Sequence, residues 1–220
     1  MNNKNFKPVS NWIFAGPIIV LFSSIIIQDK FFKSEEPIQK NQVINVENNQ
    51  EKGIIKLGDK YHIYNVEEHG EVKYITDIIS RDCKGKEVCE IDQAFKYVTN
   101  KPYTVSIKDR TPQEVIKVGG DCDEKSFLFA SILVERKHKC VIVYTKDHAF
   151  VAVYLKDRAN LYSHTASLEI DGKYYFYAET TAKNTHIGWF NGVKKESILG
   201  VYDVNEKKEI GLDRIALNIN

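Results

Sequence analysis

Hydrophobic and polar residues divide the chain into three parts. Residues 12–27 form an apolar run without a charged side chain, and the residues that follow it are mainly Asn, Gln, Glu and Lys. Further along, apolar residues recur at the spacings of helices and strands. This pattern predicts a membrane anchor or signal segment at 1–30, a polar linker at 31–53 and one folded domain at 54–220.

The apolar run 12–27 predicts a membrane segment, although it is a little short of the roughly 20 residues that cross a bilayer. A cleaved signal peptide would need small residues just after the apolar core, whereas residues 25–30 read Ile-Ile-Ile-Gln-Asp-Lys. We therefore expect one N-terminal transmembrane helix that is retained as a single-pass anchor, with a cleaved signal as the alternative. Lysines flank both ends of the run, so charge does not determine its orientation.

Within the body, the spacing of apolar residues predicts an amphipathic helix at 90–98 and a largely buried helix at 122–136. Residues 60–66 and 71–79 have the β-branched and aromatic content of strands. Four later strands are predicted at 140–144, 148–155, 167–170 and 173–180, the last two joined by the hairpin signal Asp171-Gly172. A helix followed by antiparallel strands indicates an α+β domain.

Charge and cysteine content narrow the classes of function. The chain has 31 Lys and Arg against 30 Asp and Glu, so no net field directs it to nucleic acid. Cys83 and Cys89 are spaced for a small disulfide loop if the domain is exported, or they are two unrelated thiols. His62 and His69 form no tight pair with them, so we expect no metal site, and no cofactor is implied.

Cys122 is the candidate nucleophile. Gly119-Gly120 interrupts regular secondary structure, and Asp121 is a suitable N-cap. The cysteine therefore falls in the first turn of the buried helix. Unpaired backbone N–H groups and the helix dipole favour a thiolate there. Asp121 and Asp123 oppose this effect, so the thiolate needs a histidine partner.

His148 is the best candidate for that partner, because it follows a turn and begins a strand. The remaining histidines lie in more polar stretches: His62, His69, His138, His164 and His186. Glu179 ends the strand at 173–180, and if that strand pairs with 148–155 the carboxylate can orient the imidazole. The backbone N–H of Cys122 would be one oxyanion donor, and the sequence does not name the second.

Three blocks of the sequence resemble the Cys, His and Asp blocks of the transglutaminase-like family. They read GGDCDEKS at 119–126, DHAFVAV at 147–153 and YAETT at 177–181, with a lead-in formed by 95–98, Tyr103 and 110–116. The resemblance covers 90–189, and the first block is its most specific part. It implies a papain-like α+β core with the cysteine helix packed on an antiparallel sheet, and a transglutaminase-like domain over 54–220. The family usually has aspartate where this chain has Glu179.

The expected function is that of a membrane-anchored thiol enzyme with a triad of Cys122, His148 and Glu179. The expected reaction is acyl transfer through a cysteine thioester. Hydrolysis of peptide or amide bonds is expected over crosslinking, because nothing in this small chain suggests an acyl-acceptor domain. Members of the family also crosslink glutamine to amines, so a protein-glutamine acyltransferase is the alternative. A non-catalytic membrane-tethered binding or structural module is the rival from another class.

The expected partners are a peptide or protein substrate and a membrane contacted through residues 12–27, with no nucleic acid. The expected location is the membrane, with the catalytic domain outside the cytoplasm. A disulfide-handling protein would need a Cys-x-x-Cys motif at a helix start, and Cys122 is not part of one.

Overall fold

The computed structural model describes residues 50–57, 60–67, 70–156 and 165–219, all of which belong to the compact unit Val43–Asn220. Its helices are α1 (Gly70–Ser80), α2 (Glu87–Thr99), α3 (Pro112–Val118) and α4 (Cys122–Glu135), with short 3-10 turns at Arg81–Cys83, Lys195–Ser197 and Leu212–Arg214. Its strands are β1 (Gln50–Leu57), β2 (Lys60–Glu67), β3 (Cys140–Thr145), β4 (Ala149–Tyr154), β5 (Ala166–Ile170), β6 (Lys173–Ala178), β7 (Ile198–Asp203), β8 (Lys208–Ile210) and β9 (Ile215–Ile219).

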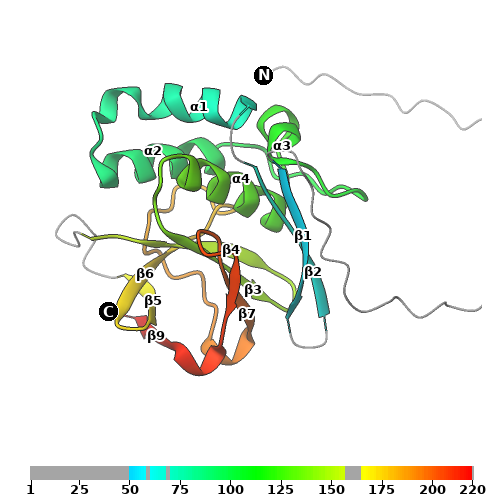
Figure 1. The fold of residues 1–220 in the computed structure, drawn as a ribbon, viewed down its shortest axis with the longest axis vertical. Coiled ribbons are helices and arrows are strands. Elements are labelled where there is room, and N and C mark those ends of the chain that lie inside the picture. The colour runs from blue at the N-terminus through cyan, green and yellow to red at the C-terminus, as the bar shows by residue number, and fades with distance from the viewer. Residues whose placement is uncertain (1–49, 58–59, 68–69, 157–164, 220) are drawn as a thin grey trace, which may run out of the picture. The chain divides into compact units, whose positions relative to one another are not determined.

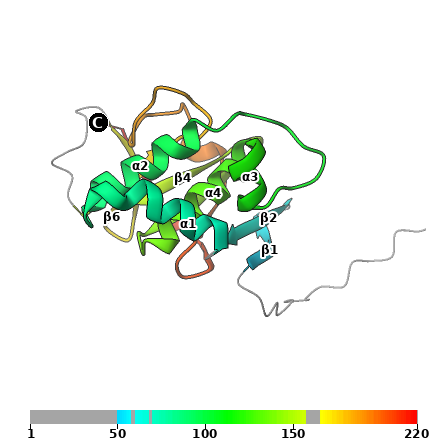
Figure 2. The same ribbon diagram turned by 90° about the horizontal axis from the view of Figure 1, so that it is seen from above.

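A seven-stranded antiparallel sheet forms the body, in the order β8-β7-β3-β4-β6-β5-β9. It curves into a half-barrel, because twisted neighbouring strands accumulate their rotation across a sheet. The helices lie together on one side of this sheet (Figures 1 and 2). β1 and β2 form a separate antiparallel pair.

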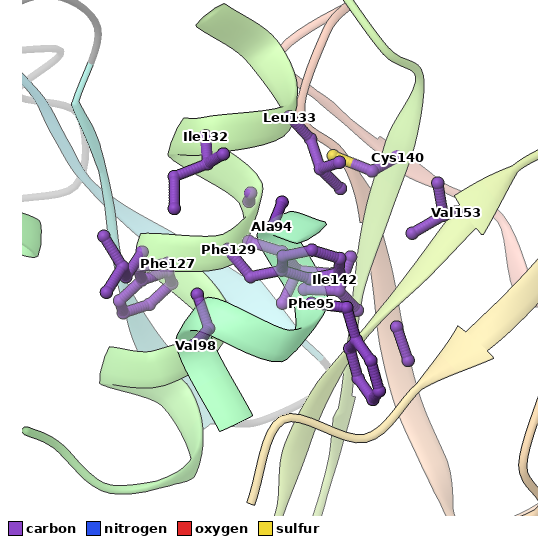
Figure 3. Close-up of a cluster of buried hydrophobic side chains, with 14 of the residues drawn as sticks. Ala94, Phe95, Val98, Phe127, Phe129, Ile132, Leu133, Cys140, Ile142 and Val153 are labelled. Carbon is purple, nitrogen blue, oxygen red and sulfur yellow. The ribbon is translucent and has the colours of Figure 1, made fainter. Parts of the chain in front are cut away.

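Helix α4 is the centre of the helical layer, since it contacts α1, α2, α3, β2, β3 and β4. Its aromatic side chains pack into a core shared with α2 and the sheet, as Figure 3 shows. The rings of Phe95 and Phe129 meet edge to face with centroids 5.9 Å apart. Almost every side of α4 is buried, which explains why its sequence has so little helical amphipathicity.

The central strands are buried on both faces. Along β3, Cys140 and Ile142 point into the core below the helices, whereas Val141 and Val143 belong to a second core on the opposite face. This is the alternation that the two-residue period of a strand requires. A half-barrel that encloses a second core therefore explains the continuous apolar run of β3.

Most of the elements predicted from spacing are confirmed. The predicted helices 90–98 and 122–136 are α2 and α4, and the four predicted later strands are β3 to β6. Asp171 and Gly172 have φ values of 49° and 73°, as the turn of a tight hairpin requires. The predicted strand 60–66 is β2.

The predicted strand at 71–79 is wrong, because these residues form helix α1. Val72, Thr76 and Ser80 are buried, Ile75 and Ile79 are partly buried, and these residues recur at helical spacing. Period therefore prevails over β-branched content in this segment.

The expected fold class, a papain-like α+β core preceded by one transmembrane helix, is wrong in that form. The sheet is an antiparallel half-barrel with a few helices. The expectation rested on motif blocks that end at residue 189, whereas β7, β8 and β9 lie beyond them and extend both edges of the sheet.

Among the described residues, no helix is long and apolar enough to cross a membrane. The predicted anchor at 12–27 lies outside the described residues. So does the predicted linker at 31–53, except for residues 50–53, which begin β1.

Candidate active site

The N-terminus of α4 holds Cys122 in a fixed position. Asp121 caps the helix by accepting a hydrogen bond from the Glu124 backbone N–H at 3.3 Å, and Glu124 accepts one from the Asp121 backbone N–H at 3.1 Å. Arg110 then donates to both oxygens of Glu124, from its backbone N–H at 2.7 Å and from its guanidinium at 3.2 Å. This reciprocal capping box places the partly exposed cysteine at the first helical position.

His148 is carried by the turn between β3 and β4. The Thr145 backbone N–H and hydroxyl both donate to the His148 carbonyl oxygen, at 2.8 and 3.1 Å. The imidazole stacks on the Phe150 ring at an interplanar angle of 20°. These contacts fix the ring, whose side chain remains 26% exposed.

Glu179 follows the last residue of β6, and β6 pairs with β4 as predicted. Its carboxylate is 4% exposed and lies 2.6 Å from Nε2 of His148. The same oxygen accepts from Asn191 Nδ2 at 3.1 Å, and the other oxygen accepts from the Thr181 backbone N–H at 3.0 Å and hydroxyl at 2.6 Å. A buried carboxylate with four donors is an acceptor held in the ionised state.

The electrostatics of the pair follow from these contacts. Burial raises the pKa of Glu179, but the hydrogen bonds from His148 and Thr181 outweigh it and hold the pKa at about 2. Burial lowers the pKa of His148, but its side-chain hydrogen bonds with Cys122 and Glu179 and their negative charges raise the pKa to about 10. His148 is therefore an imidazolium at neutral pH.

The Cys122 side chain lies close enough to the imidazole to help raise the pKa of His148, and it completes the series of three residues. Since Nε2 of His148 faces Glu179, Nδ1 is the ring nitrogen left for the thiol. The structure thus brings together all three residues that the sequence nominates. A cysteine at a helix start beside a protonated imidazole is an arrangement that could support thiol chemistry.

The two acidic neighbours of Cys122 oppose its thiolate less than their sequence suggests. Burial, a hydrogen bond with Asp121 and the charge of Asp121 raise the pKa of Asp123 to about 7. Asp123 is therefore protonated for part of the time at neutral pH, so less negative charge stands beside the cysteine.

Lys125 adds a cation behind the site. It is only 1% exposed, and its Nζ donates to the carbonyl oxygens of Thr99 and Lys101 at 3.4 and 3.1 Å. Burial lowers its pKa to about 8, while the charge of Glu179 raises it and that of Lys183 lowers it. The lysine thus lies within electrostatic reach of the Glu179 carboxylate.

The other three cysteines are in different states. Cys83 and Cys89 form a disulfide, which settles the alternative that the spacing left open. Cys140 is a free thiol that is 1% exposed, and burial raises its pKa. Figure 3 shows it among the apolar side chains of the core. Cys122 is accordingly the one free thiol that solvent can reach.

Several residues of the site were not found from the sequence. Asn191 and Thr181 fix Glu179, and Lys125 lies beneath it. Thr181 lies two residues beyond Glu179 inside the third motif block, which is a usable signal. Asn191 reaches the site from a loop, and no spacing rule connects it to the triad. Within the described residues, no group of three or more His, Cys, Asp or Glu side chains could hold a metal ion.

Comparisons of the chain with protein-family models, with curated proteins and with solved structures gave no match. Any proposal of function therefore rests on the geometry of the site and on the sequence motifs.

Proposed function

We propose that this protein is a thiol enzyme that hydrolyses amide or peptide bonds through an acyl-cysteine intermediate. The observation that carries the proposal is the hydrogen bond of 2.6 Å between the His148 imidazole and the buried Glu179 carboxylate, together with the Cys122 side chain near enough to that imidazole to raise its pKa. Each of these residues alone could have a purely structural role. Their arrangement in series supports a catalytic role, because it brings together a thiol at a helix N-terminus, a protonated imidazole and a carboxylate that accepts four hydrogen bonds.

The reaction divides into two halves. The Cys122 thiolate attacks the carbonyl carbon, a C–S bond forms, and the carbonyl electron pair moves to oxygen. When the oxyanion collapses, the C–N bond breaks and His148 gives its proton to the leaving amine. Neutral His148 then takes a proton from water, the hydroxide adds to the thioester, and the C–S bond breaks to release the acid and the thiolate. Glu179 keeps the ring oriented and stabilises its charged form.

The resemblance of the three motif blocks to the transglutaminase-like family supports the same roles for Cys122, His148 and Glu179. That family also contains crosslinking acyl transferases, in which an amine replaces water in the second half. The chemistry of the site allows either acceptor, so the choice of water is part of the proposal and has its own test.

The disulfide Cys83–Cys89 supports a location outside the cytoplasm, because such bonds persist in oxidising compartments. The proposed substrates are then peptides or proteins of that compartment. The test is to block free thiols in intact cells with an alkylating reagent and then to reduce the protein. Cys83 and Cys89 should escape the reagent, because they become free thiols only on reduction. Two blocked cysteines before reduction would place the domain in a reducing compartment.

The test of the activity uses 4-nitrophenyl acetate, a general acyl donor, on the purified full-length chain. The proposal predicts a burst of nitrophenol stoichiometric with enzyme and an acetyl group on Cys122, found by peptide mass spectrometry. Cys122→Ser should lose both. Adding a primary amine distinguishes the acceptors, because an amide product would indicate transfer and acetate alone would indicate hydrolysis. No acetylation of Cys122 in the wild type would refute the proposal.

A further inference from the structure

The segment that joins α2 to α3 lies against the residues just before Cys122. Tyr103 forms an isolated parallel bridge with Gly120. The Gly120 backbone N–H donates to the Pro102 carbonyl oxygen, and the Thr104 backbone N–H donates to the Gly120 carbonyl oxygen, both at 3.1 Å. Tyr103 is therefore fixed by its backbone beside a residue two positions before the candidate nucleophile.

The glycine pair of the cysteine motif is what permits this approach. Gly119 has φ +81°, and a Cβ there would stand 2.2 Å from the Pro102 carbonyl oxygen. A Cβ on Gly120 would stand 2.9 Å from the side chain of Glu124. A side chain at Gly119 would therefore push the segment that carries Tyr103 away, and one at Gly120 would disturb the helix cap.

Arg110 holds the same segment from its other end. Its guanidinium donates to the Thr104 carbonyl oxygen at 3.2 Å, to the Thr104 hydroxyl at 2.8 Å and to the Gly119 carbonyl oxygen at 3.3 Å. The backbone of Tyr103 is thus held firmly, although its side chain is 55% exposed. An exposed phenol on a fixed backbone, beside the residues that precede the candidate nucleophile, is a candidate for contact with substrate.

The phenol is also within electrostatic reach of the nucleophile. Partial burial raises the pKa of Tyr103, as do the negative charges of Cys122, Asp121 and Asp123. The hydroxyl therefore keeps its proton at neutral pH and is a hydrogen-bond donor throughout the range in which the site would work.

The proposed reaction needs such a donor. Attack on a carbonyl creates an oxyanion next to the sulfur, and the Cys122 backbone N–H, one of the unpaired donors of the helix start, stabilises it. A second donor is needed on the same side. Two polar side chains of the site are already engaged: Ser126 with the carbonyl oxygens of Cys122 and Ala149, and Asn191 with Glu179.

We infer that the Tyr103 hydroxyl is the second oxyanion donor, and that it binds the carbonyl oxygen of the acyl donor as negative charge develops there. The inference rests on the proposed function. Tyr103 donates a hydrogen bond and transfers no proton, so the proton path through His148 is unchanged. Gly119 serves this arrangement by letting the segment that carries Tyr103 approach the residues before the cysteine.

The test compares two reagents on the full-length wild type and on Tyr103→Phe. 4-Nitrophenyl acetate passes through a tetrahedral oxyanion, whereas iodoacetamide alkylates a thiolate by direct displacement at a saturated carbon and forms no oxyanion. We expect Tyr103→Phe to acylate about 100-fold more slowly, the usual effect of removing one oxyanion donor, while its alkylation rate stays within about twofold of wild type. Tyr74→Phe, which alters an exposed tyrosine of α1, is the matched control and should change neither rate.

The other outcomes separate the two proposals. An acylation rate unchanged in Tyr103→Phe would overturn the inference and leave the triad intact. Equal losses of acylation and alkylation would also overturn it, since Tyr103 would then support the thiolate or the fold. A wild-type Cys122 that reacts with neither reagent would refute the proposed function, and the inference with it.

Discussion

Glu179→Gln is the substitution that most sharply tests the electrostatics of the triad. The carboxylate accepts from four donors, on His148, Asn191 and Thr181. Glutamine keeps the shape of the side chain, but its NH₂ group is a donor. In either orientation of the amide, its NH₂ group faces hydrogen-bond donors, those of His148 and Asn191 or those of Thr181. The negative charge beside His148 is also lost.

The size of the effect on catalysis follows from the lost interaction. A hydrogen bond to a charged group contributes about 1.5–3 kcal/mol. At about 1.4 kcal/mol for each factor of ten, the reaction of Cys122 with 4-nitrophenyl acetate should slow by about 10-fold to 150-fold. Iodoacetamide alkylation at pH 6 should slow as well, because the imidazolium that pairs with the thiolate is less stable without Glu179.

Stability should change with a definite dependence on pH. Because the pKa of Glu179 falls from an ordinary 4.5 to about 2, its ionised form stabilises the fold by about 3 kcal/mol. A depressed pKa gives stability that is present above about pH 4.5 and is lost as the pH falls toward 2. The difference in unfolding free energy between wild type and Glu179→Gln should therefore shrink over that interval.

The matched control is Glu169→Gln, a half-buried glutamate of β5 that accepts a hydrogen bond from Asn218 at 3.3 Å and lies outside the triad. Denaturant unfolding gives the stabilities, and peptide mass spectrometry gives the rates at Cys122. A folded Glu179→Gln protein that reacts at the wild-type rate would refute the role assigned to the carboxylate.

Two further predictions concern the scaffold of the site. Gly119→Ala should lower the melting temperature by several degrees more than Gly172→Ala. Both glycines have positive φ, but an added Cβ would lie 2.2 Å from a backbone carbonyl oxygen at Gly119 and would meet nothing within 4 Å at Gly172. Equal shifts in melting temperature would show that the close approach carries no cost. Replacing both Cys83 and Cys89 with alanine should cost about 2 kcal/mol of unfolding free energy, since the bond closes a loop with a sequence separation of 6, and an unchanged denaturation midpoint would contradict this.

Spacing predicted the elements whose burial is one-sided or complete. α4 and the strands β3 to β6 contribute to the two cores, so their apolar content stands out in the sequence. α1 was misassigned because its β-branched residues outweighed its helical period. β7, β8 and β9 were not assigned at all, since their exposed and half-buried positions dilute the pattern at the edges of the sheet.

The candidate site was predictable only where local structure positions a residue. Cys122 is placed by a helix cap, and His148 and Glu179 are placed by two strands whose pairing could be guessed. Asn191 reaches the carboxylate from a loop, and Tyr103 meets the cysteine motif through a bridge across the intervening α3. Contacts of this kind depend on tertiary structure, and the local spacing of apolar and polar residues carries no information about them.

The most direct test of the account is the rate of iodoacetamide alkylation of Cys122 at pH 6, measured on the folded full-length chain and on His148→Ala. Buried Cys140, whose pKa is raised, serves as the internal reference in the same digest. The account predicts rapid labelling of Cys122 in the wild type, little labelling of Cys140, and at least a tenfold loss at Cys122 in the variant. Labelling of Cys122 that is as slow as that of Cys140 and indifferent to His148 would contradict the thiolate–imidazolium pair.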